Sequence, residues 1–114
     1  MVVPSVGAVV LVLFPFSDLS QAKVRPAVCL ADAGRGDWVL CQVTSQAFSD
    51  DLAVPLGLAD FASGGLLVPS YARPNKLFTA NVRILVRAVG GLNPATTTRL
   101  LVAVTSLFQP RARP

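Results

Sequence analysis

Apolar residues in this chain form short runs that turn-forming residues separate. Residues 7–14 are apolar at every position and end at a proline, a pattern typical of a strand buried on both faces. Residues 25–31 and 38–44 predict two further strands, joined by a turn over residues 32–37, where two glycines stand. We expect the polar residues 15–24 to form a loop between the first two strands.

The middle of the chain predicts shorter elements. Residues 52–55 indicate an edge strand because they end in a proline, and residues 58–62 indicate one helical turn, stopped by two glycines. We expect an extended run over residues 66–68, and residues 70–79 suit a surface loop. The alternation over residues 81–88 predicts a half-buried strand that ends at Gly90 and Gly91. Its buried face would consist of Val82, Ile84, Val86 and Ala88.

One helix is predicted near the C-terminus. Asn93 offers an N-cap side chain, and Pro94 takes the first helical position, where its missing N–H is not needed. Residues 95–108 follow as the helix, and we expect residues 110–114 to be a frayed basic tail. The expected apolar stripe of the helix consists of Leu100, Val104, Leu107 and Phe108.

These elements indicate a mainly β fold in a single domain over residues 1–114. Five or six short strands and a terminal helix predict a small, strongly bent sheet or barrel. The first strand is apolar on both faces, whereas the inside of a small barrel covers only one of them. We expect the helix and a second subunit to cover the other face, and therefore a homodimer.

The composition supports one packed core and excludes several kinds of chemistry. The 114 residues are 53% apolar and 14% charged, which argues against disorder. The chain contains no His, and all of its acidic residues are Asp. This excludes His general bases, Ser-His-Asp triads and Cys-His nucleophiles, and it disfavours zinc. We expect no metal and no cofactor.

The net charge indicates which kind of partner the protein suits, and the cysteines and the N-terminal apolar run indicate its cellular compartment. The net charge of +4 suits a polyanionic partner as well as it suits simple solubility. Cys29 and Cys41 lack metal-ligand spacing, and we expect two buried thiols rather than a disulfide. The N-terminal apolar run is about half as long as the ~20 residues of a membrane helix, and no Lys or Arg precedes it. We therefore expect a core strand of a cytoplasmic protein with no membrane segment.

The predicted hairpin brings two polar side chains to one end of the sheet. If Ala31 lies opposite Trp38, then Arg25 lies opposite Thr44, on the same face and with Cβ atoms about 5 Å apart. This register sends the two cysteines to opposite faces, whereas a slip by one residue sets them against each other. A guanidinium beside a hydroxyl suits a phosphodiester. The alternative is a structural arginine at the rim, with Thr44 and Ser45 capping a turn.

Two other polar segments are candidates for chemistry. Asp50 and Asp51 lie in a loop rich in Ser and Asp, and we expect them to be solvated rather than to hold a metal. Tyr71, Arg73 and Lys76 combine an aromatic ring with two cations. That combination suits base stacking with phosphate contacts, and it equally suits a surface loop ahead of a strand.

Three segments, taken in order, resemble the MazF/PemK toxins of bacterial toxin–antitoxin systems. They are residues 7–31 (GAVVLVLFPFSDLSQAKVRPAVCLA), 38–46 (WVLCQVTSQ) and 70–79 (SYARPNKLFT). The resemblance extends to about Gly91. It implies an SH3-like barrel of five to seven short strands with one C-terminal α-helix. It also implies a homodimer that cleaves single-stranded RNA at short sequences without a metal and is silenced by a cognate antitoxin.

The resemblance assigns roles to individual residues. The family's catalytic pair corresponds to Arg25, which precedes Pro26, and Thr44. Many relatives carry a Glu ahead of the Arg-Pro pair, where this chain has Ser20-Gln21. Further substrate contacts are implied for Lys23, Ser45, Gln46, Ser70, Arg73 and Lys76.

The implied reaction is attack of the ribose 2′-hydroxyl on the adjacent phosphate, which leaves a 2′,3′-cyclic phosphate and a 5′-hydroxyl. The loops over residues 15–24 and 48–58 are expected to decide which sequence is cut. The alternative function is a non-catalytic toxin of the same fold that poisons DNA gyrase or binds RNA without cleaving it.

Overall fold

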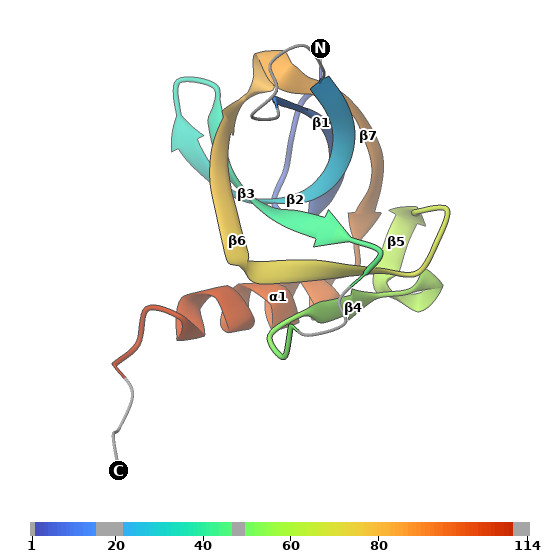
Figure 1. The fold of residues 1–114 in the computed structure, drawn as a ribbon, viewed down its shortest axis with the longest axis vertical. Helices are drawn as coiled ribbons and strands as arrows, with labels where there is room; N and C mark the ends of the chain where they lie inside the picture. Colours follow the sequence, from blue (N-terminus) through green and yellow to red (C-terminus); the bar gives the residue numbers. More distant parts are fainter. Residues whose placement is uncertain (1, 16–21, 47–49, 111–114) are drawn as a thin grey trace.

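Seven antiparallel strands form one curled sheet in the computed structural model, which describes residues 2–15, 22–46 and 50–110 (Figure 1). Their order across the sheet is β4-β6-β3-β2-β1-β7-β5. The predicted mainly β barrel with a C-terminal helix is confirmed. The strands are β1 (Ala8–Pro15), β2 (Ala22–Gly34), β3 (Asp37–Thr44), β4 (Val54–Leu56), β5 (Phe61–Gly64), β6 (Ser70–Asn81) and β7 (Leu85–Leu92).

The sheet curls where its ladders are interrupted. Cys41 pairs with Leu77 and Val43 with Ala72, so β6 has four residues where β3 has Gln42 alone. Pro74, which has no N–H to offer a ladder, is buried in this bulge. Because extra residues on one strand bend it and increase its twist, β6 turns a corner there (Figure 1).

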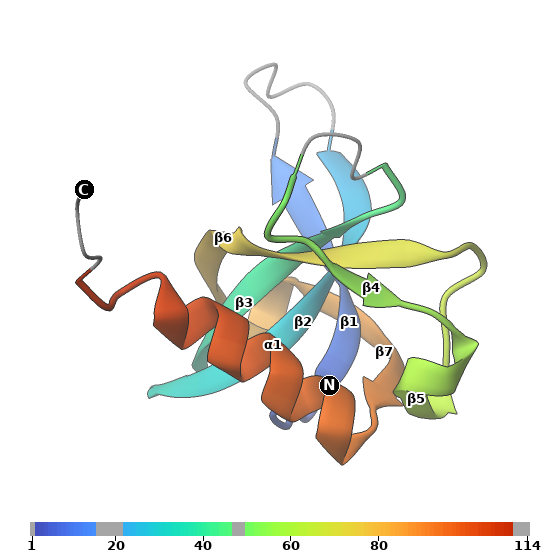
Figure 2. The same ribbon diagram turned by 90° about the horizontal axis from the view of Figure 1, so that it is seen from below.

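The two faces of the curled sheet carry separate apolar clusters. Val10, Val12 and Cys29 belong to one cluster, whereas Val9 and Cys41 belong to the other, which includes residues of the helix. The helix, α1 (Pro94–Ser106), lies across the second face (Figure 2). The cysteines are free thiols on opposite faces, as predicted. Burial raises the pKa of Cys29 to about 11 and that of Cys41 to about 12.

The predicted start of the helix is confirmed. Asn93 Oδ1 accepts a hydrogen bond of 2.8 Å from the backbone N–H of Thr96, and Pro94 occupies the first turn. Leu100 and Val104 are buried against the sheet. The predicted apolar stripe is wrong at its end, because the helix stops at Ser106 and the side chain of Phe108 is 73% exposed.

The C-terminal half of the sheet differs most from the predictions. Residues 70–79 belong to strand β6 and not to a loop. Asn81 caps a short 3₁₀ turn, η2 (Val82–Ile84), which shifts the phase of the next strand. As a result Leu85 is buried and Val86 is 52% exposed, the reverse of the predicted alternation, in which Val82, Ile84, Val86 and Ala88 were to be buried. Strand β7 also continues through Gly90 and Gly91 instead of ending there.

Other boundaries moved by a few residues. β2 begins at Ala22, within the predicted loop, and the edge strand β4 lies at residues 54–56. The 3₁₀ turn η1 (Leu58–Asp60) is followed by strand β5, which was not predicted, whereas residues 66–68 are not in a strand. The predictions for Ser20, Gln21 and the tail over residues 111–114 lie outside the described residues. No helix in the described part of the chain is long and apolar enough to cross a membrane.

Candidate functional site

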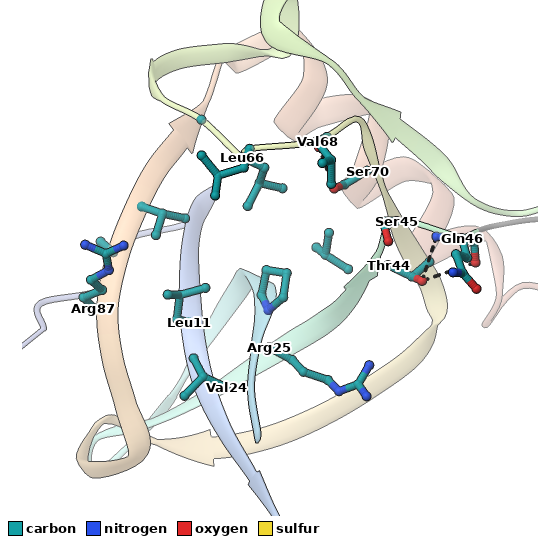
Figure 3. A pocket seen from close by; sticks show the side chains of 16 residues that line it. Leu11, Val24, Arg25, Thr44, Ser45, Gln46, Leu66, Val68, Ser70 and Arg87 are labelled. Carbon is teal, nitrogen blue, oxygen red and sulfur yellow. Dashed lines mark hydrogen bonds between the residues drawn. The ribbon is translucent and has the colours of Figure 1, made fainter. Parts of the chain in front are cut away.

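A cleft of about 880 Å³ opens beside the ends of β2 and β3 (Figure 3). Its floor is apolar and comes from adjacent strands, with Leu11 on β1, Pro26 on β2 and Val43 on β3. Residues 65–68, which connect β5 to β6, form one lip. The polar and cationic side chains around this floor are those of Arg25, Thr44, Ser45, Gln46, Ser70 and Arg87.

The ladder beside the cleft has the predicted register. Ala27 pairs with Gln42 and Cys29 with Leu40, and the same count continued two residues beyond Ala27 and Gln42 sets Arg25 level with Thr44. The register changes at the other end of the hairpin, where a bulge pairs Ala31 with Val39 and not with Trp38. The error at Ala31 leaves the site unaffected because the bulge lies beyond Cys29.

Arg25 and Thr44 border the same two hollows. Both line the large cleft, and both line a smaller recess of about 120 Å³ together with Phe14, Gln42 and Arg73. Arg25 is exposed, and its side chain extends toward the side of the cleft where Thr44 lies (Figure 3). A permanent cation and a hydroxyl therefore face one space that a phosphate group can enter.

The Thr44 hydroxyl is held by the backbone of Gln46. Its oxygen accepts a hydrogen bond of 3.0 Å from the N–H of Gln46, and the hydroxyl donates over 3.2 Å to the carbonyl oxygen of the same residue. The predicted turn-capping role of Thr44 is thus present. A hydroxyl has one proton and two lone pairs, so its proton can turn to another acceptor while the oxygen keeps its contact with Gln46 N–H.

The other residues predicted to contact the substrate differ in burial and in whether they line the cleft. Ser70 is buried, and its hydroxyl donates over 2.9 Å to the carbonyl oxygen of Val68, which holds the lip in place. Ser45 and Gln46 are exposed at the cleft. Lys23 and Lys76 are also exposed but are absent from the linings of both hollows described above.

Arg73 forms an ion pair that the sequence did not predict. Its Nε donates to Asp50 Oδ2 over 2.7 Å, and the Asp50 side chain is only 7% exposed. The prediction that Asp50 is solvated is therefore wrong. The Arg73 contact, helped by the N–H of Leu52, holds the pKa of Asp50 below its usual value.

Two contributors to the cleft were missed by sequence reasoning. Arg87 falls on the polar side of the alternation over residues 81–88, and no pattern in the sequence indicates which strand lies beside it. Leu66, Leu67 and Val68 were predicted as an extended run but instead form the lip, where Leu67 is fully exposed. A short apolar run directly after two glycines was the available signal for such an exposed segment. Within the described residues, no three His, Cys, Asp or Glu side chains gather as metal ligands.

Comparison with known proteins places the fold. No protein-family model matches the chain, and no curated protein matches it. A chain of the MazE–MazF complex from Deinococcus radiodurans matches with a TM-score of 0.75 and 21% identity, over 92% of this chain and 95% of that chain. An endoribonuclease from Mycobacterial species matches with a TM-score of 0.69 and 21% identity, over 96% of this chain and 95% of that chain.

A third match comes from a structure of an endoribonuclease in complex with its cognate antitoxin, also from Mycobacterial species. It has a TM-score of 0.67 and 20% identity, over 96% of this chain and 97% of that chain. The chain therefore has the fold of these MazF and endoribonuclease structures, as the sequence resemblance implied.

Proposed function

We propose that this protein is a MazF-type toxin, an endoribonuclease that cleaves single-stranded RNA at short sequences without a metal. It acts in the cytoplasm as a homodimer, and a cognate antitoxin neutralises it. The placement of Arg25 and Thr44 on one rim, where both line the same two hollows, supports this proposal most directly. The fold shared with solved endoribonucleases adds to it.

The chemistry follows from what RNA itself supplies. The ribose 2′-oxygen attacks the adjacent phosphorus while the bond from phosphorus to the 5′-oxygen breaks, so the protein needs no nucleophile. The 2′-hydroxyl gives its proton to water, and the leaving 5′-oxygen takes one up. The products are a 2′,3′-cyclic phosphate and a 5′-hydroxyl. The protein must align the attack and stabilise the extra negative charge on the phosphate.

Arg25 and Thr44 bind the phosphate in two different ways. The Arg25 guanidinium supplies charge and a planar pair of donors to the non-bridging oxygens, although it is a poor proton donor or acceptor. When RNA is bound, the Thr44 hydroxyl turns from the carbonyl oxygen of Gln46 and donates its hydrogen bond to the phosphate instead. The N–H of Gln46 continues to hold the hydroxyl oxygen in place. Orientation and electrostatics therefore account for most of the rate.

Two features support the proposed partners. Leu13 and Val24 pair across β1 and β2 and are 42% and 47% exposed, so a second copy of the chain has an apolar surface to cover beside the cleft. Solved structures of this fold include complexes with MazE and with a cognate antitoxin. An extended acidic segment of an antitoxin would neutralise the cations of the rim and block entry of RNA.

A cleavage assay in EDTA tests the enzymatic proposal. Purified protein should cut a random-sequence single-stranded RNA and leave cyclic phosphate ends. The Arg25→Ala variant should lose at least about a hundredfold in rate, as removal of a main charge-stabilising donor typically does. Arg83→Ala, which removes an equal charge outside both hollows, is the control. Intact RNA with the wild-type protein, together with trapped gyrase complexes on plasmid DNA, would favour the non-catalytic alternative.

The dimer is tested by light scattering after gel filtration. Leu13→Arg should convert the dimer to a monomer because it places a charge in the apolar contact. Val102→Arg serves as the control, since Val102 is similarly exposed but lies on α1. A wild-type protein that is monomeric at micromolar concentration contradicts the homodimer.

A further inference from the structure

Arg87 stands on the wall of the cleft opposite Arg25 and Thr44. It is exposed on β7 and lines the cleft together with Ala88 and Val89. Figure 3 shows it on one side of the apolar floor, with Thr44 on the other. A cation on each side of an apolar floor suits a strand of nucleic acid, which carries negative phosphates on either side of each sugar and base.

The ladders fix the spacing between Arg87 and the strand that carries Arg25. Leu11 of β1 pairs with Arg87 on one side and with Pro26 on the other, so the three residues form one row across the sheet. Opposed residues share a face, and neighbouring strands lie about 4.8 Å apart. The backbones of Arg87 and Pro26 are therefore about 10 Å apart across this row, with Leu11 between them.

The charge of Arg87 is not neutralised by a carboxylate in the described part of the chain. Arg73 is paired with Asp50 and Arg99 with Asp60, whereas residues 2–15, 22–46 and 50–110 offer Arg87 no ion-pair partner. An arginine that lines a cleft without a carboxylate beside it retains its five donors for an anionic ligand.

We propose that Arg87 binds a phosphate of the RNA strand next to the one held by Arg25 and Thr44. This inference rests on the proposed function. The aliphatic floor of Leu11 and Pro26 seats the sugar and base between the two phosphates, and Arg87 acts as a substrate-positioning residue. It contributes to binding of the ground state and the transition state alike, so its removal raises KM and leaves kcat unchanged.

The test compares Arg87→Ala with Arg83→Ala, an equal loss of charge on η2 outside both hollows. Cleavage of a random-sequence single-stranded RNA gives kcat and KM, and binding of the same pool with 2′-O-methyl riboses gives affinity without cleavage. Arg87→Ala should raise KM and weaken binding about tenfold and lower the salt slope of binding by about 0.7. Arg83→Ala should change each value less than twofold, and Arg87→Lys should restore part of the affinity.

A neutral linkage locates the contact. When the cut site has been read from the products, a methylphosphonate is placed at each linkage that flanks it. One of these substitutions should weaken binding to the wild-type protein and have little further effect on Arg87→Ala, since both remove the same contact. Equal effects of Arg83→Ala and Arg87→Ala, or full additivity at every linkage, overturn the inference while cleavage stands. A wild-type protein that neither binds nor cuts the pool overturns the proposed function as well.

Discussion

The guanidinium of Arg73 donates to the carboxylate of Asp50 over 2.7 Å, which ties strand β6 to the segment ahead of β4. Arg73 also lines the small recess that Arg25 and Thr44 share. The site therefore contains one cation that is already partly neutralised. The ion pair lowers the positive potential at this end of the cleft and fixes the position of the Arg73 side chain.

Release of Arg73 should strengthen RNA binding. In Asp50→Ala the Arg73 guanidinium has no carboxylate beside it. We expect the affinity for single-stranded RNA at low salt to rise about threefold, because a negative charge that repels the RNA phosphates is gone. Fluorescence anisotropy with 2′-O-methyl RNA measures this change. Asp51→Ala, an exposed neighbour with the same change of charge, is the control. An equal gain in both variants would assign the effect to net charge alone.

The Thr44 hydroxyl can be removed without a change of shape. Thr44→Val should lower the cleavage rate by about a hundredfold, as loss of one charge-stabilising donor does, whereas Thr44→Ser should retain most of the activity. Single-turnover cleavage of RNA measures both. Loss of the bond to Gln46 should cost about 1 kcal/mol of unfolding free energy. A Thr44→Val variant that cleaves as fast as the wild type contradicts the catalytic role.

Gly64 and Gly65 differ in what surrounds them, although they are adjacent in sequence. A Cβ on Gly64 would overlap the carbonyl oxygen of Val89, and the φ angle of Gly64 is +61°, whereas a Cβ on Gly65 meets nothing within 4 Å. Gly64→Ala should therefore destabilise the protein by about 2–3 kcal/mol, through strain and steric overlap with β7. Gly65→Ala should be nearly neutral. Urea unfolding of both variants tests this, and similar stability would contradict the close approach.

Asp60 should make the stability of the folded protein depend on pH. Its carboxylate accepts 2.7 Å and 2.8 Å hydrogen bonds from the Thr96 hydroxyl and the Gly57 N–H, and these bonds, with the Arg99 charge, lower its pKa. A carboxyl whose pKa is lower in the folded state stabilises the protein above its unfolded pKa of about 3.9, and that contribution is lost as the pH falls through the folded value. Asp60→Asn should be less stable at pH 7.

The difference between Asp60→Asn and the wild type should shrink below about pH 4, where the wild-type carboxyl is protonated too. Thermal unfolding between pH 2 and pH 7 measures both proteins. Asp32→Asn is the matched control because Asp32 is exposed in the β2–β3 hairpin. A constant gap across this range would show that Asp60 stabilises the fold in a manner independent of its charge.

Local sequence determined those parts of the protein whose physical cause is local. The buried run at β1, the cap at Asn93 and the register of Ala27 with Gln42 depend on side chains that are neighbours along a strand, a turn or a hairpin. The pairing of small with large residues was sufficient to bring Arg25 level with Thr44. No contact between distant segments was needed for that prediction.

Tertiary structure alone decided the rest. Residues 70–79 contain Arg, Pro, Asn and Lys, which favour a loop locally, yet they form a strand because β3 and β4 pair with them on either side. Arg87 reaches the cleft because β7 returns to pair with β1, a contact between opposite ends of the chain. Pairing partners that are distant in sequence, and the bulges that bend their strands, depend on how the whole sheet closes, which periodicity within one segment does not encode.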